Sequence, residues 1–333
     1  MEKIGAKIVV IGGGTGSFML LDALKHYCSN ITALVNMADD GGSTGVLRDE
    51  LGVLPPGDIR QCLVALSRSS ERMRELFNFR FAKGTFAGHS FGNLFLTAVE
   101  KMTDNFADSV DLASEVLNIT GQVVPITLDK VTLVMEQSDG KVTRGEFKIG
   151  HLNFGRHTRP KIRLEPKASL TPKAKEALLK ADLIVIAPGN IYGSLAPALV
   201  VGGVSEAVAA SNAKKVYVCN LMTQPGQTDG FKVHDFAAEI ERFLGQPLDY
   251  VLYNNAKPNK ALMQRYAKEG EYWVGADESK LKKAHYEAIG AHFVSGEPWR
   301  PDDAKADPIA HSRTLIRHDA DKAARTLMKI YFN

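Results

Sequence analysis

A turn with four glycines among five residues, Gly12-Gly13-Gly14-Thr15-Gly16, most constrains what this chain can fold into. It follows the β-branched run 7–11, which is typical of a strand buried on both faces of a parallel sheet. It precedes residues 17–25, whose apolar side chains recur at helical spacing. A strand, a glycine turn and a helix in this order direct free backbone N–H groups at a bound anion. Thr15 or Ser17 can cap the helix or donate a hydroxyl to the same anion.

A second glycine-rich loop, Asp39-Asp40-Gly41-Gly42-Ser43-Thr44, follows the next predicted strand at residues 30–36. Asp39 stands 25 residues after Gly14, near the spacing at which an acidic residue meets the ribose hydroxyls of a bound nucleotide. The pattern G-x-G-x-x-G from Gly12 would end on Ser17, so the turn alone is a weak dinucleotide signal. Paired carboxylates beside a phosphate cradle suit Mg²⁺, which makes Asp39 and Asp40 candidate metal ligands as well as turn residues.

The composition narrows the class of protein. With 333 residues, 44% of them hydrophobic and 24% charged, the chain can bury the core of one large or two smaller α/β domains. A net charge of +3 without a basic block beside aromatic residues argues against a nucleic-acid partner. The three cysteines are isolated, which fits reduced thiols, and no signal peptide or membrane-length apolar run is apparent. We therefore expect a cytoplasmic protein without a membrane partner.

Strand and helix patterns alternate through most of the chain, which predicts a Rossmann-like α/β three-layer sandwich with a mainly parallel sheet. Two β-rich runs flank the turn Asp139-Gly140 and predict a hairpin within a small β insertion at about residues 123–165. We expect a nucleotide-binding core at residues 1–255. Residues 256–333 are expected to form an α-rich extension packed on that core.

The polar loops after Ile11, Met37, Ala187 and Asn220 each follow an apolar predicted strand. In an open parallel sheet the carboxyl ends of the strands share one edge, where ligands bind. We therefore expect these loops to build one extended pocket. Two further motifs add polar side chains. In the first, Asp58 is a natural helix N-cap and Arg60 can reach a phosphate. In the second, His89 and Asn93 lie at the start of a later helix.

Five ordered motifs resemble those of the YvcK (gluconeogenesis factor) proteins of the CofD-like family, whose namesake is a 2-phospho-L-lactate transferase. The likeness runs from about residue 8 to residue 255. It is carried by the glycine turn, Ala38-Asp39-Asp40-Gly41-Gly42-Ser43-Thr44-Gly45, Pro55-Pro56-Gly57-Asp58-Ile59-Arg60, Gly88-His89-Ser90-Phe91-Gly92-Asn93 and Met222-Thr223-Gln224-Pro225-Gly226-Gln227-Thr228-Asp229-Gly230.

The resemblance implies a Rossmann-like core that binds a nucleotide-bearing ligand, UDP-N-acetylglucosamine or a related UDP-sugar. It also implies a role in carbon metabolism, cell-wall synthesis and cell shape, with a regulated protein partner, and it is compatible with a homo-oligomer. Together with the loop pattern it makes the following residues candidates for ligand binding: Gly12, Gly13, Gly14, Thr15, Gly16, Asp39, Asp40, Gly41, Gly42, Ser43, Thr44, Asp58, Arg60, His89, Asn93, Gly189, Asn190, Tyr192, Asn220, Thr223 and Gln224.

Two classes of function compete for this chain. A UDP-sugar-binding regulator needs no catalytic residue, and the sequence lacks a nucleophile elbow, a P-loop lysine and a zinc signature. The alternative is a Mg²⁺-dependent transferase of the CofD type acting on a nucleotide-linked substrate, in which Asp39, Asp40 and His89 would serve the chemistry. An NAD(P)-dependent oxidoreductase is a third and weaker alternative, because no group stands out for hydride transfer.

Overall fold

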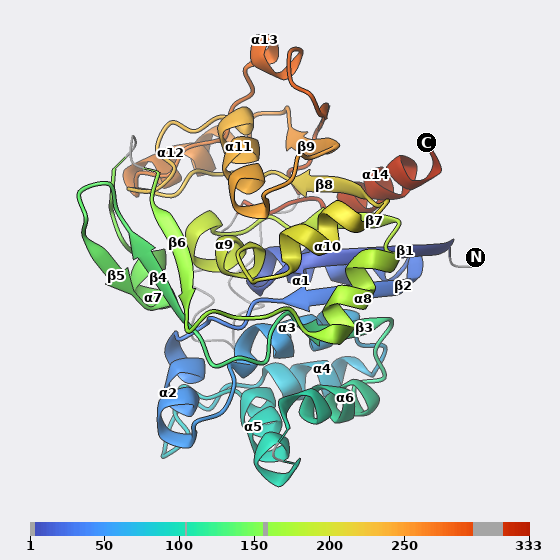
Figure 1. Cartoon of the computed structure of the whole chain (residues 1–333), viewed down its shortest axis with the longest axis vertical. Coiled ribbons are helices and arrows are strands. Elements are labelled where there is room, and N and C mark those ends of the chain that lie inside the picture. Colours follow the sequence, from blue (N-terminus) through green and yellow to red (C-terminus); the bar gives the residue numbers. More distant parts are fainter. Residues whose placement is uncertain (1–3, 104, 156–158, 296–315) are drawn as a thin grey trace.

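The computed structural model describes residues 4–103, 105–155, 159–295 and 316–333. Its centre is a seven-stranded sheet in the order β10-β9-β8-β7-β1-β2-β3, with parallel neighbours throughout (Figure 1). The strands are β1 (Ile4–Gly12), β2 (Cys28–Val35), β3 (Gln122–Pro125), β7 (Leu183–Ile186), β8 (Lys214–Val218), β9 (Tyr250–Asn254) and β10 (Glu287–Ala291).

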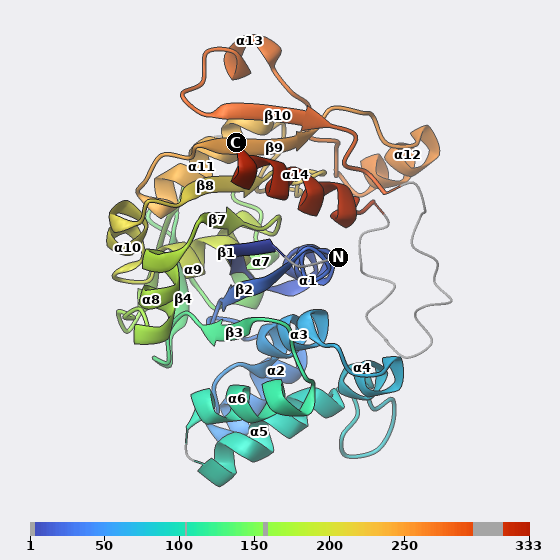
Figure 2. The ribbon, with the colours of Figure 1, turned by 90° about the vertical axis from the view of Figure 1, so that its right-hand side faces the viewer.

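Helices cover both faces of this sheet, as Figure 2 shows from the side. On one face lie α1 (Gly14–Leu24), α3 (Pro56–Leu66) and α14 (Ala320–Phe332), and on the other α8 (Pro172–Lys180), α9 (Ala196–Leu199), α10 (Val204–Ala210) and α11 (Val233–Leu244). Beyond β3 pack α2 (Gly42–Leu51), α4 (Glu71–Asn78), α5 (Phe91–Thr103) and α6 (Phe106–Val116), while α12 (Lys260–Lys268) and α13 (Glu278–Leu281) lie near the opposite edge. The predicted three-layer α/β fold is confirmed.

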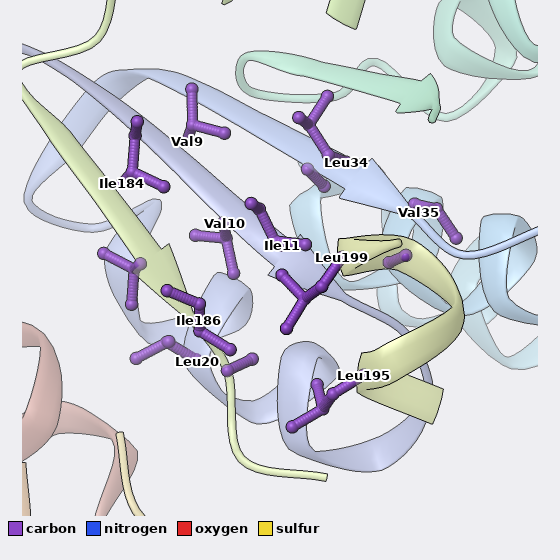
Figure 3. Packing of buried hydrophobic residues seen from close by; sticks show 14 of the residues in the cluster. Val9, Val10, Ile11, Leu20, Leu34, Val35, Ile184, Ile186, Leu195 and Leu199 are labelled. Carbon is purple, nitrogen blue, oxygen red and sulfur yellow. The ribbon is translucent and has the colours of Figure 1, made fainter. Parts of the chain in front are cut away.

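The core forms where β1 is enclosed on both sides. The side chains of residues 8–11 are at most 2% exposed, as expected for a central parallel strand. Figure 3 shows Val10 and Ile11 of β1 packed with Ile186 of β7, Leu20 of α1 and Leu195, which belongs to the short helix η1 (Ile191–Leu195). The apolar run before the glycine turn is thus buried at the middle of the molecule, which fixes the turn at the edge of the sheet.

The predicted β insertion forms a separate antiparallel sheet in the order β5-β4-β6. It consists of β4 (Thr132–Glu136), β5 (Val142–Arg144), the short helix α7 (Glu146–Gly150) and β6 (Lys161–Glu165). The hairpin around Asp139-Gly140 is confirmed. The insertion begins later than expected, however, because residues 122–125 form β3 and pair with β2 in the main sheet.

The described part of the C-terminal segment contains the helices α12, α13 and α14, and it also supplies β10, the edge strand that pairs with β9. One other expectation needs correction. Asp58 is not the cap of its helix: α3 begins at Pro56 with Pro55 as N-cap, so Asp58 lies within the first turn. Among the described residues, no helix is both long and apolar enough to cross a membrane.

Candidate functional site

The glycine turn lies at the switch point of the sheet. From β1 the chain proceeds to β2 and β3 on one side, and it returns at β7 to build β8, β9 and β10 on the other. Ligands of open α/β sheets bind outside the carboxyl ends of the strands at this point. Here the turn approaches the loop after β7 so closely that a Cβ on Gly16 would lie 1.9 Å from the Pro188 carbonyl oxygen. Gly14 has φ +67°, a left-handed conformation that favours glycine.

A cavity of about 680 Å³ opens at this switch point. The loops after β1, β7 and β8 all contribute to it, although they lie far apart in the chain. Its lining includes these sequence-predicted residues: Gly13, Gly14, Thr15, Gly16, Gly189, Asn190, Asn220, Thr223 and Gln224. The structure thus brings three of the four predicted loops to one cavity, whereas the loop after β2 lies beside it.

The amides at the start of α1 supply donors to this cavity. The N-cap of α1 is Gly13, which has no side chain with which to cap the helix. Asp58 accepts a hydrogen bond from the Gly14 N–H, while the N–H groups of Thr15 and Gly16 have no protein acceptor within the described parts of the chain. First-turn amides of a helix favour a negatively charged partner. The turn can therefore receive an anion next to Asp58.

Amide side chains hold the loops of the cavity in place. Asn220 donates from Nδ2 to the Gly189 carbonyl oxygen at 2.7 Å and accepts at Oδ1 from the Gly189 N–H at 3.3 Å. Asn190 accepts from the Tyr192 and Gly193 N–H groups and donates to Gln224 Oε1 at 2.6 Å. These two asparagines join the loops after β7 and β8 into one rigid wall.

Three carboxyl groups meet beside the glycine turn. Burial and the neighbouring charge of Asp39 raise the pKa of Asp58 to about 7. Burial, then the charges of Asp39, Asp58 and Asp40, raise the pKa of Glu146 to about 9. Burial also raises the pKa of Asp39, against hydrogen bonds from the Gly41 N–H and the Thr44 hydroxyl. The cluster combines acids from the loop after β2, from α3 and from the β insertion.

Asp40 holds the β insertion in place through its short helix α7. Its carboxylate accepts hydrogen bonds from the N–H groups of Glu146 at 3.1 Å and Phe147 at 2.7 Å, so it binds the N-terminus of α7. At the other end of α7, Gln224 donates to the Gly150 carbonyl oxygen at 2.6 Å, and Gln227 donates to that of Ile149 at 2.9 Å. These hydrogen bonds at the two ends of α7 hold it against the site and place the Glu146 side chain beside Asp39 and Asp58.

Ser43, His89, Asn93 and Arg60 form a second polar group outside the cavity. Ser43 Oγ lies 2.9 Å from His89 Nδ1 and accepts from Asn93 Nδ2 at 3.2 Å. Arg60, only 4% exposed, donates from Nε to Asn93 Oδ1 at 3.0 Å and from Nη1 to Asn78 Oδ1. Arg60 therefore lies inside the protein, where it orders this network, and does not line the cavity.

Two further sequence-predicted residues are not among those that line the cavity. Tyr192 is fully buried, and its hydroxyl donates to Glu239 Oε2 at 3.4 Å. It packs among aromatic side chains and so differs from the expectation of a ligand contact. Ser17 is also buried, and its hydroxyl has no hydrogen-bond partner in the described residues.

The structure adds residues to the site that the sequence did not single out. Glu146 reaches it through the β insertion, as does His151 at the cavity wall. Glu271, Arg317 and His318 line the cavity from the C-terminal part of the chain. Burial lowers the pKa of His318 to about 4, and its Nε2 lies 3.0 Å from the Cys219 carbonyl oxygen, so the neutral ring donates there.

Comparison with known proteins agrees with this fold and site. Residues 8–294 match the family model described as 2-phospho-L-lactate transferase CofD. A putative gluconeogenesis factor of Thermotoga maritima is 39% identical, covering 97% of this chain and 99% of that protein. The gluconeogenesis factor of Bacillus subtilis is 37% identical, with 97% and 98% covered.

A solved structure shows the same architecture. The crystal structure of a Bacillus halodurans protein superposes with a TM-score of 0.88 at 38% identity, covering 98% of this chain and all of that one. The resemblance drawn from the five motifs is therefore confirmed. The chain belongs to the CofD family, and it is similar over nearly its whole length to the members named gluconeogenesis factors.

Proposed function

We propose that the chain is a regulatory protein of carbon metabolism that binds a UDP-sugar such as UDP-N-acetylglucosamine. The names of its relatives support the metabolic role. The ligand proposal rests on the Thr15 and Gly16 amides, which line a cavity of about 680 Å³ and have no acceptor among the described residues. That volume lies within the range of small-molecule sites, about 300–1,000 Å³.

In this proposal the diphosphate meets the glycine turn, and the nucleoside and sugar extend along the wall built by the loops after β7 and β8. Backbone N–H groups of the turn can bind the phosphate oxygens directly. Thr223 and Asn220 offer polar groups to the sugar or the base. A UDP-sugar of this kind would connect the protein to cell-wall synthesis and cell shape, and such a regulator acts in the cytoplasm through a protein partner.

Mg²⁺ is the cofactor that the acidic groups favour. Within the described residues, no group of three or more His, Cys, Asp or Glu side chains could hold a metal on its own. Mg²⁺ does not need such a cage, because it binds through one or two carboxylates together with phosphate oxygens and water. Asp39 and Asp58 have no ion pair with a Lys or Arg side chain in the described residues and would hold it, whereas Asp40 is engaged by α7.

The same acidic cluster favours a second candidate function, a Mg²⁺-dependent transferase acting on a nucleotide-linked substrate. When bound, Mg²⁺ would neutralise charge on the transferred phosphoryl group. Glu146, whose raised pKa keeps it protonated at neutral pH, could donate a proton to a phosphate oxygen or a leaving group. His89, bonded to Ser43 outside the cavity, is less well placed for this chemistry.

Calorimetry of the apo protein tests both functions. UDP-N-acetylglucosamine, NAD and GTP are titrated with and without Mg²⁺, and the nucleotide is then recovered and analysed. The regulator predicts one UDP-sugar bound per chain and recovered unchanged. Turnover of the nucleotide would instead support the transferase. Binding of NAD in preference to the UDP-sugar would contradict both.

A further inference from the structure

A second polar cavity, of about 420 Å³, lies at the opposite edge of the sheet from the glycine turn. It is formed where α1 and α3 end, at the start of α4 and just before β3. Its lining residues are Asp22, Lys25, His26, Ser67, Arg68, Ser69, Arg74 and Thr120. None of them lines the cavity at the switch point. The two cavities are therefore separate sites.

Three of these residues are cationic, and one is acidic. The acid, Asp22, is already paired, because its Oδ1 lies 2.7 Å from Lys25 Nζ. Lys25 also donates to the carbonyl oxygens of Ala65 at 2.7 Å and Ser67 at 3.0 Å, which satisfies the C-terminal end of α3. The Lys25–Asp22 pair is therefore a fixed, neutral part of the wall. The charges of Arg68 and Arg74 remain unbalanced by it.

Neither arginine forms an ion pair within the described parts of the chain. Arg68 donates from Nε to Thr120 Oγ1 at 2.5 Å, which fixes its guanidinium but leaves the terminal nitrogens without an acceptor among the described residues. Arg74 Nε is buried and has no hydrogen-bond partner in the described residues. Arg74 also lines the cavity, so its guanidinium is a second cationic group at this wall.

We propose that this cavity is an anion site that takes a phosphate group, either inorganic phosphate or the phosphate of a small metabolite. Two guanidinium groups facing one cavity can each bind phosphate oxygens in the bidentate geometry that arginine provides. The Ser69 hydroxyl adds a neutral donor at the same wall. Phosphate binding here is independent of what the first cavity binds. Because α1 and α3 each begin beside the glycine turn and end here, an anion at this site would bind at the far end of both helices.

Calorimetry with inorganic phosphate and with glucose 6-phosphate, at constant ionic strength in chloride, tests the proposal. The test variant is Arg68→Gln combined with Arg74→Gln. The matched control is Arg72→Gln. It removes an exposed arginine of α4, the helix that carries Arg74, and Arg72 does not line the cavity. We expect the wild type and the control to bind phosphate, and the double variant to lose one binding event or weaken it at least tenfold. Tighter binding of glucose 6-phosphate than of inorganic phosphate would identify a phosphorylated metabolite as the ligand.

Phosphate could also enter the first cavity, and the double variant distinguishes the two positions. Unchanged phosphate binding in the double variant, or no phosphate binding to the wild type, would overturn the proposal. If the double variant fails to fold, as judged by its melting curve in chloride, the single variant Arg68→Gln, which changes only an exposed residue, serves as the test. Failure of UDP-sugar binding in the wild type would bear on the proposed function and not on this site.

Discussion

The carboxylate of Asp58 lies where a side chain on Gly13 would stand, since a Cβ on Gly13 would be 1.9 Å from Asp58 Oδ2. Gly13 has an extended backbone with φ −155°, so the close approach and not the dihedral angle requires glycine here. Asp58 also accepts from the Gly14 N–H. The first turn of α3 is thereby docked on the glycine turn, and an acidic group lies directly beside that turn.

Gly16→Ala should destabilise the protein and weaken ligand binding. The new methyl group would lie 1.9 Å from the Pro188 carbonyl oxygen, so the loops after β1 and β7 must separate. We expect a loss of about 1–3 kcal/mol in the free energy of unfolding, measured by chemical denaturation. Gly5→Ala is the control, because nothing lies within 4 Å of its Cβ position. Equal stability of the two variants would show that the close approach is absent in solution.

The acidic cluster should make the apo protein less stable as the pH rises. Asp58 and Glu146 titrate near pH 7 and 9 in the folded protein, against ordinary pKa values of 3.8 and 4.5. Between the ordinary and the raised pKa of each group, the folded state binds more protons than the unfolded state. Stability should therefore fall with rising pH from about 4 to 9, by at most about 1.4 kcal/mol per pH unit for each group.

Glu146→Gln isolates one part of that dependence. Replacing the acid by a neutral amide should flatten the decline above pH 7, measured as the free energy of unfolding in denaturant titrations at several pH values. Glu75→Gln, on an exposed position of α4, should leave the pH profile unchanged. A pH profile that Glu146→Gln does not alter would contradict the placement of this residue.

If Mg²⁺ binds Asp39 and Asp58, it should stabilise the wild type more at pH 8 than at pH 5, where both carboxylates are more fully protonated.

Arg60→Ala should act on stability more than on ligand contacts. Arg60 is buried and donates to Asn93 and Asn78, so its removal leaves a cavity and takes the donor from the buried amide oxygen of Asn93. We expect a cost of about 2–4 kcal/mol, measured by denaturant unfolding. Arg72→Ala on the exposed side of α4 should cost less than about 0.5 kcal/mol. A fully stable Arg60→Ala variant would contradict the buried network.

Asp40→Ala should loosen the β insertion from the site. The substitution removes the acceptor of the Glu146 and Phe147 N–H groups at the start of α7, worth about 1–2 kcal/mol. Hydrogen exchange of residues 145–150 should accelerate, while that of β1 stays slow. Asp49→Ala, at an exposed position of α2, should leave the exchange of α7 unchanged. Unaltered exchange of α7 in the Asp40→Ala variant would show that the contact does not hold the insertion.

The sequence predicts the central elements well, because their signals are local. The apolar runs before the loops give β1, β2 and β7, and the glycine turn marks the start of α1. The edge strands β3 and β10 escape prediction, because one is short and ends in Pro125 and the other contains Gly290 and few β-branched residues. Their strand conformation depends on pairing with a neighbour already in place.

The residues of the candidate site likewise differ in whether local sequence predicts their position. The loops that line the cavity follow from strand order, since the ends of parallel strands share an edge. Glu146 could not be found in this manner, because it approaches Asp58 only through the docking of α7. Nor does local sequence distinguish Arg60, which is buried against Asn93, from an arginine that faces a ligand. Such distinctions depend on tertiary packing between segments remote in the chain.

Hydrogen–deuterium exchange with and without UDP-N-acetylglucosamine tests most directly that three separate loops bind one ligand. If one ligand contacts all three loops, residues 12–16, 188–190 and 220–225 become protected together, at the same ligand concentration. Residues 67–74, at the far edge of the sheet, should not change. Protection confined to one of these loops, or located elsewhere while the ligand is bound, would contradict the shared site.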